Sequence, residues 1–96
     1  MVCMRDIRNR RDEILQIAEK HGADNLRIFG SVARGQAEEA SDLDILVHLE
    51  ESRSLLDHIA LKHDMEDLLG CVVDVVDDDA IYEDLRGQVL AESVPL

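Results

Sequence analysis

The seven residues from Leu43 to Leu49 restrict the possible folds of this 96-residue chain more than any other feature. Their sequence, LDILVHL, alternates so that four aliphatic side chains share one face of a strand, whereas Asp44 and His48 share the opposite face. An apolar face needs a covering layer. The segment therefore predicts a sheet that is packed on one side and carries ionisable groups on the other.

Helices and strands alternate around this segment. Apolar side chains at helical spacing, each series followed by a glycine, predict helices over residues 6–21 and 54–69. Strands are predicted at 25–29 and 71–76, and a last helix at 78–93, with Ile81, Leu85 and Val89 on one face. This order indicates one α/β domain, residues 1–96, with a small mixed sheet of about three strands and helices packed on one face. A full helix between the strands at 43–49 and 71–76 makes those two strands parallel.

Composition excludes several classes of function. The formal net charge of -12 opposes binding to a polyanion, so direct nucleic-acid binding is disfavoured, whereas divalent metals or a basic partner protein would match the acidity. Cys3 and Cys71 form no zinc-binding cluster. No segment approaches the roughly 18 apolar residues of a membrane span or has the apolar core of a signal peptide. We therefore expect a cytoplasmic protein with reduced thiols and no membrane association.

Gly30 and Ser31 stand where the first predicted strand gives way to a short helix. Gly30 allows a tight turn or a close approach of the backbone, and Ser31 places a hydroxyl beside the free N–H groups of the first helical turn. Arg34 adds a cation nearby. These groups predict a site for a phosphate.

Three aspartates are expected to meet at this phosphate site. Asp42 and Asp44 lie two apart on a strand and point the same way, with Cα atoms about 6.6 to 6.8 Å apart. Asp74 interrupts the apolar run CVVDVV and would lie about 4.8 Å from Asp44 if the parallel strands are neighbours. Mg²⁺ prefers such oxygen ligands and is completed by substrate phosphates. Two Mg²⁺ ions held by Asp42, Asp44 and Asp74 would support nucleotidyl transfer from a nucleoside triphosphate.

At these positions the sequence resembles a known family. Gly30-Ser31, ten further residues, and then Asp42-x-Asp44 match the G-S-x10-D-x-D signature of the DNA-polymerase-β-like nucleotidyltransferase superfamily. The segments FGSVARG and SDLDILV are similar to its minimal nucleotidyltransferase (MNT) branch, which includes MntA-type antitoxins. The similarity extends along the whole chain and implies the nucleotidyltransferase fold.

The resemblance also implies roles and a partner. It assigns Asp42 and Asp44 to Mg²⁺ binding, Asp74 to activation of the acceptor hydroxyl, and Gly30 and Ser31 to the donor triphosphate; Arg34 matches a common family residue. MNT proteins commonly pair with HEPN-domain proteins, and the MntA type transfers AMP from ATP to a tyrosine of the HepT toxin. The resemblance therefore implies an antitoxin that is a protein adenylyltransferase.

Simpler interpretations remain beside these. The motif could be a turn glycine followed by solvated aspartates, and Asp74 could face solvent or pair with a basic residue. Asp77, Asp78 and Asp79 are expected to cap the last helix. His48 lies roughly 13 Å along the strand from Asp44, too far for a direct ligand. Tyr82 could accept a nucleotide, but a partly buried tyrosine is the simpler expectation.

Two other functions stay open. A non-catalytic antitoxin could neutralise its partner by masking a surface, although a decayed site would not need to keep Asp74. Transfer to a small molecule such as an aminoglycoside is disfavoured because nothing in a chain of this size supplies the second wall of such a pocket.

Overall fold

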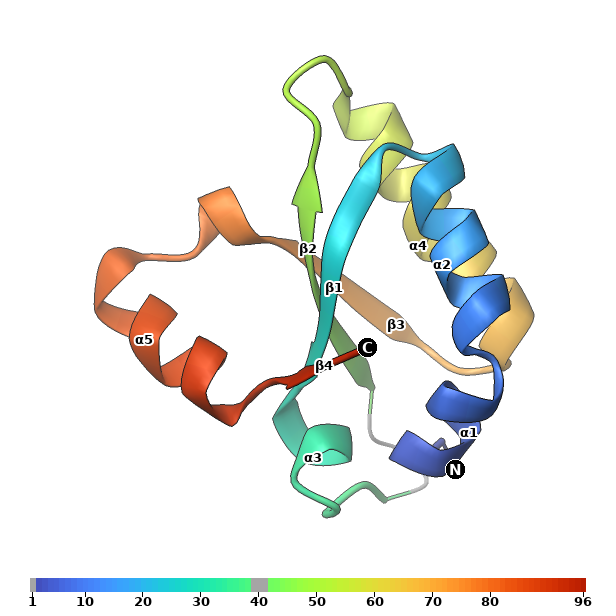
Figure 1. Cartoon of the computed structure of the whole chain (residues 1–96), viewed down its shortest axis with the longest axis vertical. Helices are drawn as coiled ribbons and strands as arrows, with labels where there is room; N and C mark the ends of the chain where they lie inside the picture. The colour runs from blue at the N-terminus through green and yellow to red at the C-terminus, as the bar shows by residue number, and fades with distance from the viewer. Residues whose placement is uncertain (1, 39–41) are drawn as a thin grey trace.

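The computed structural model describes residues 2–38 and 42–96 and shows a sheet with helices against it (Figure 1). The described helices are α1 (Met4–Asn9), α2 (Arg11–Lys20), α3 (Gly30–Ala33), α4 (Leu55–Leu69), the 3₁₀ turn η1 (Asp78–Ala80) and α5 (Glu83–Glu92). The strands are β1 (Ala23–Phe29), β2 (Leu43–Leu49), β3 (Val73–Asp77) and β4 (Val94–Pro95). The sheet order is β3-β2-β1-β4; β1 is antiparallel to β2 and β4, and β2 is parallel to β3. The predicted mixed α/β fold is confirmed.

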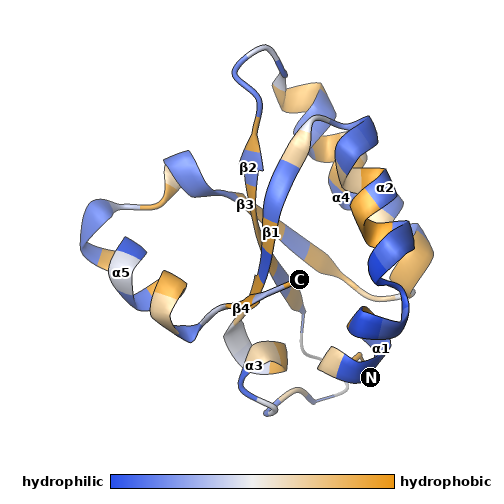
Figure 2. Ribbon diagram, in the orientation of Figure 1, coloured by the Kyte–Doolittle hydropathy of each residue, from blue (hydrophilic) through white to orange (hydrophobic). Residues whose placement is uncertain are grey.

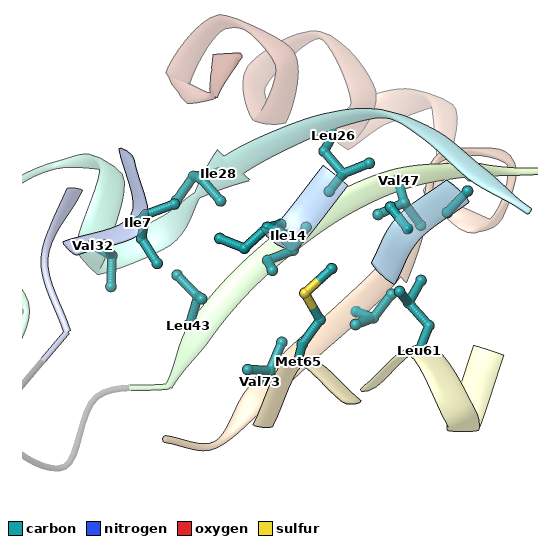
Figure 3. Close-up of a cluster of buried hydrophobic side chains, with 14 of the residues drawn as sticks. Ile7, Ile14, Leu26, Ile28, Val32, Leu43, Val47, Leu61, Met65 and Val73 are labelled. Atoms are coloured by element: carbon teal, nitrogen blue, oxygen red, sulfur yellow. The ribbon is translucent and has the colours of Figure 1, made fainter. Parts of the chain in front are cut away.

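The hydrophobic core lies between the sheet and helices α1, α2 and α4 (Figure 3). The four aliphatic side chains of β2 that were predicted to share the apolar face are all buried, with Ile45 fully inaccessible. Ile14 from α2 and Met65 from α4 are also fully inaccessible. Complete burial of each such side chain contributes about 1.5 to 3 kcal/mol. This packing fixes the direction of β2 and turns Asp44 away from the core.

Helix α4 holds β3 in place through its side chains as well as its apolar face. Glu66 Oε2 accepts a hydrogen bond from Val73 N at 3.0 Å, and His58 Nε2 lies 2.7 Å from the carbonyl oxygen of Val75. Both contacts are on the edge of β3 that faces away from β2. The helix begins at a capping box formed by Ser54 and Asp57. These contacts keep β3 beside β2, and this placement positions Asp74.

The sheet has one more strand than the sequence indicated. Val94 and Pro95 pair with Ile28 and Arg27 of β1, so the chain ends in a short edge strand. Two residues are too few for a periodic pattern, and Pro95 is tolerated because an edge strand needs no N–H on its outer side. The predicted last helix is correspondingly divided: η1 comes first, and α5 begins only at Glu83.

The leading helix is also divided, into α1 and α2, at Arg10 (φ -110°, ψ 18°). Ile7 and Ile14 lie on either side of the break and are both fully buried. Arg10 Nη1 donates a hydrogen bond to the carbonyl oxygen of Leu68 in α4 at 3.3 Å. The break therefore coincides with a contact that is distant in the sequence, which helical periodicity does not report.

Helix α5 stands apart from the other helices. It lies on the opposite side of the sheet from α2 and α4 (Figure 1), and none of its residues is buried. Leu85 is 51% exposed while Ile81 and Val89 are half-buried, so the apolar face predicted for the last helix is only partly covered. Apolar positions on α5 are visible in Figure 2 among polar ones. None of the helices in the described ranges combines the length and apolar character needed to cross a bilayer.

Candidate active site

Asp44 and Asp74 are partners across the parallel strands β2 and β3. The register runs from Leu43 beside Val73 to Val47 beside Asp77, which confirms the predicted parallel pairing. On its other side Asp44 is paired with Phe29, the last residue of β1. Asp44 is half-buried, whereas Asp42 and Asp74 are exposed. The strand geometry thus brings two of the predicted site residues together at the end of β1.

Gly30 follows Phe29 directly and lies against the Asp44 carboxylate. Its φ is +73°, in the left-handed region that favours glycine, and a Cβ atom at this position would overlap Asp44 Oδ2. Both the backbone conformation and the close approach require glycine. The two halves of the sequence motif, Gly30-Ser31 and Asp42-x-Asp44, are therefore in contact in the folded chain.

The electrostatics of Asp44 indicate a concentration of negative charge. Burial raises the pKa of its carboxyl group, the negative charges of Asp74 and Asp42 raise it further, and Arg34 lowers it. Each carboxylate makes ionisation of Asp44 less favourable. A cation among these groups would relieve both the repulsion and the desolvation penalty.

This donor set fits a magnesium ion. Three carboxylates supply only oxygen ligands, the type that Mg²⁺ prefers, and the exposure of Asp42 and Asp74 leaves room for water and phosphate. Among the described residues, the carboxylate oxygens of Asp42, Asp44 and Asp74 do not all lie within 4.8 Å of one another, so the three side chains alone do not form a compact metal site. Asp42, Asp44 and Asp74 would hold the ion together with oxygens from a bound triphosphate.

Ser31 lies on α3, a single turn of four residues from Gly30 to Ala33, and Arg34 is its C-cap residue. The sequence predicted a phosphate site at the start of this helix, and a helix of one turn contributes only a small dipole to such a site. Ser31 is half-buried, and Arg34 ends the turn. The N–H groups of the turn, the Ser31 hydroxyl and the Arg34 guanidinium remain as possible phosphate donors.

The comparison with protein families identifies the family to which the chain belongs. A model described as "Nucleotidyltransferase domain" matches residues 11–94. The chain belongs to this nucleotidyltransferase family. A relative from Thermococcus cleftensis, named protein adenylyltransferase MntA, is 42% identical over 79 residues, which cover 82% of this chain and 80% of the relative. The expectation of an enzyme of the nucleotidyltransferase class is confirmed.

Solved structures agree with this nucleotidyltransferase assignment. A structure provisionally described as a minimal nucleotidyltransferase superposes with a TM-score of 0.89 at 49% identity, covering 99% of this chain and 97% of that one. A toxin–antitoxin structure with AMP-PNP superposes with a TM-score of 0.75 at 22% identity, covering 88% of this chain and 69% of that one. The second likeness shows the shared fold alone. The predicted nucleotidyltransferase fold is thus confirmed, whereas the roles of individual residues stay predictions.

The nucleotidyltransferase domain carries a second ionisable cluster farther along β2. His48 Nδ1 lies 3.0 Å from Asp78 Oδ1, and Asp79 completes a group whose possible ligand atoms lie within 4.8 Å of one another. The hydrogen bond to Asp78 raises the pKa of His48. Sequence reasoning missed this cluster because it assigned the three consecutive aspartates to the last helix. Asp77 instead caps η1 by accepting a hydrogen bond from Asp79 N at 3.0 Å.

Two further residues differ from expectation. Tyr82 is the N-cap residue of α5 and is 80% exposed, so the expectation of a partly buried tyrosine was wrong. Glu92, at the end of α5, lies 3.8 Å from Arg34 and was not singled out from the sequence. Its position 58 residues after Arg34 left no local signal for this pairing.

Proposed function

We propose that this nucleotidyltransferase transfers AMP from ATP to a tyrosine hydroxyl of a partner protein, a HEPN-domain toxin of the HepT type, and acts as its antitoxin in the cytoplasm. The observation that carries the proposal is the meeting of Gly30 with Asp44 and of Asp44 with Asp74. The Thermococcus relative named protein adenylyltransferase MntA supports the acceptor class. The toxin–antitoxin structure with AMP-PNP supports this kind of partner and donor.

The proposed roles follow from position. Asp42, Asp44 and Asp74 would hold two Mg²⁺ ions, and Gly30, Ser31 and Arg34 would hold the donor triphosphate. Asp74 is exposed on the strand next to Asp44 and can accept a proton from an incoming hydroxyl. Magnesium, when bound, would neutralise the triphosphate and stabilise the departing pyrophosphate.

The proposed reaction is an in-line displacement at the α-phosphorus of ATP. The tyrosine oxygen forms the new P–O bond while the bond to the pyrophosphate oxygen breaks, and the hydroxyl proton passes to Asp74. Gly30 leaves the space that the Asp44 carboxylate occupies, and the α3 turn orients the phosphates. The products are pyrophosphate and a partner protein that carries AMP on tyrosine.

The test is incubation of the purified pair with Mg-ATP, followed by intact mass spectrometry of the partner. We expect an increase in mass of one or more AMP groups, which both Asp42→Asn and Asp44→Asn should abolish without loss of the fold. Asp12→Asn is a matched control, because the Asp12 side chain is 93% exposed and lies on α2. Full transfer by either site variant would refute the assigned roles.

The alternative is a non-catalytic antitoxin that masks a surface of its partner. Its distinguishing outcome in the same experiment is neutralisation of the partner without any AMP adduct. The charge of -12 would favour a basic partner in either case. The raised pKa of Asp44 favours the catalytic proposal, because a crowded acidic group is costly for a fold that makes no use of it.

A further inference from the structure

Arg34 contacts the end of α5 as well as the proposed nucleotide site. Its Nη1 lies 3.8 Å from Glu92 Oε2, and its Nε donates a hydrogen bond to Gln36 Oε1 at 3.2 Å. Arg34 is also close enough to Asp44 to lower the pKa of that carboxyl group. Its positive charge therefore acts both on Asp44 of the acidic site and on Glu92, a carboxylate from the other end of the chain.

Glu92 is the more firmly held of the two partners. It is the last residue of α5, and the next residue, Ser93, is buried and accepts a hydrogen bond from Arg27 Nε at 2.6 Å. Val94 then pairs with Ile28 of β1. The backbone beside Glu92 is thus fixed to the sheet, whereas Arg34 follows the single turn α3 and has a long, half-exposed side chain that can reach more than one partner.

We infer that Glu92 is a positioning residue that competes with the donor triphosphate for Arg34, an inference that rests on the proposed function. Without nucleotide, the Glu92 carboxylate forms an ion pair with the Arg34 guanidinium and keeps it beside the site. A triphosphate offers oxygens with more charge and bidentate geometry, so it displaces Glu92 when it binds. Glu92 consequently lowers the affinity for nucleotide, although it lies outside the sequence motif.

The expected effect is limited by solvent. Both side chains of the pair are close to half exposed, at 47% for Arg34 and 45% for Glu92. Exposed ion pairs of this kind change an equilibrium by up to about fivefold. Glu92→Gln, which keeps the shape of the side chain and removes its charge, should therefore tighten nucleotide binding about two- to fivefold.

A double-mutant cycle separates competition for Arg34 from a general change in charge. The dissociation constant of Mg-AMP-PNP is measured by titration calorimetry for the wild type, Glu92→Gln, Arg34→Gln and the double variant. We expect tighter binding by Glu92→Gln, weaker binding by Arg34→Gln, and no effect of the Glu92 change once Arg34 is absent. Glu83→Gln, an equal change of charge at the exposed start of α5, should leave the affinity unchanged.

Two results would overturn the inference. One is an unchanged dissociation constant for Glu92→Gln, and the other is equal tightening with and without Arg34, which would indicate general repulsion of the triphosphate. The proposed function fails separately. If the four dissociation constants change as expected but no AMP is transferred to a partner protein, the role of Glu92 is supported and protein adenylylation is refuted. If AMP is transferred but Glu92→Gln binds nucleotide no more tightly than the wild type, protein adenylylation is supported and the role of Glu92 is refuted.

Discussion

Asp44→Asn should stabilise the folded protein at neutral pH while it abolishes nucleotidyl transfer. The Asp44 carboxylate is half-buried beside Gly30, and Asp74 is its neighbour on the adjacent strand. Burial first, and then the charges of Asp74 and Asp42, raise its pKa, so its ionised form is disfavoured in the folded state. An asparagine keeps the shape and removes the charge.

The size of the gain follows from the sheet geometry. Neighbouring strands lie about 4.8 Å apart, and two unit charges at that distance repel by roughly 0.9 kcal/mol in water and about 3.5 kcal/mol at an effective dielectric constant of 20. Asp74 is exposed, so the lower figure applies. A gain of about 1 kcal/mol raises the melting temperature of a domain of this size by roughly 4 to 8 °C.

The assay is thermal unfolding of the wild type and Asp44→Asn across a range of pH without magnesium. Because the folded pKa of Asp44 is raised, the wild-type penalty is present above that pKa and disappears as the pH falls through it. The difference between the two proteins should therefore be largest near neutral pH and shrink in acid. Asp12→Asn removes one negative charge, as Asp44→Asn does, but at an exposed site, and should change the melting temperature little.

The reasoning would be refuted by a variant that melts at or below the wild-type temperature at pH 7. A gain that persists unchanged in acid would also refute it, because a protonated Asp44 no longer repels Asp74. Magnesium provides an independent check. The metal should raise the melting temperature of the wild type and have a smaller effect on Asp44→Asn, because binding to the folded state alone stabilises it.

Two other substitutions test particular contacts. Gly30→Ala should destabilise the fold by about 1 to 3 kcal/mol in urea unfolding. Gly35→Ala should destabilise it less, because both glycines have positive φ but only Gly30 lies against Asp44. Equal losses of stability in the two variants would contradict the importance of the contact between Gly30 and Asp44. Asp64→Asn should cost about 1 kcal/mol at pH 7, because it removes the negative charge from the side chain that pairs with His21 at 2.6 Å. That hydrogen bond lowers the pKa of Asp64, so the difference in melting temperature should vanish as the pH falls through this lowered pKa, and a loss independent of pH would exclude the charge as its cause.

The sequence predicted the parts of the fold that depend on local periodicity. The alternation in β2 identified its buried face, and the helix that follows required β2 and β3 to be parallel. That parallel pairing was enough to place Asp74 beside Asp44. The relation between the two residues could be predicted because strand register and side-chain alternation are regular properties of the backbone.

Other features depend on contacts between distant residues and left no local signal. Strand β4 has two residues and exists because β1 offers an open edge. The pairing of Arg34 with Glu92 depends on where the end of α5 lies relative to α3, which helical periodicity does not indicate. Such features follow from tertiary packing, which overrides propensity and periodicity in short segments.

The buried face of β2, opposite the face that carries Asp44, explains how the fold tolerates the repulsion between Asp44 and Asp74. Leu43 and Ile45 stand on either side of Asp44 in the sequence, and these two side chains and that of Val47 are at most 1% exposed. Each buried aliphatic side chain contributes about 1.5 to 3 kcal/mol, more than the roughly 1 kcal/mol of repulsion between Asp44 and Asp74. The strand cannot move to separate the carboxylates without withdrawing these side chains from the core. The carboxylates are therefore held together before any cation or nucleotide arrives, and ligand binding can use the relief of that repulsion as part of its free energy.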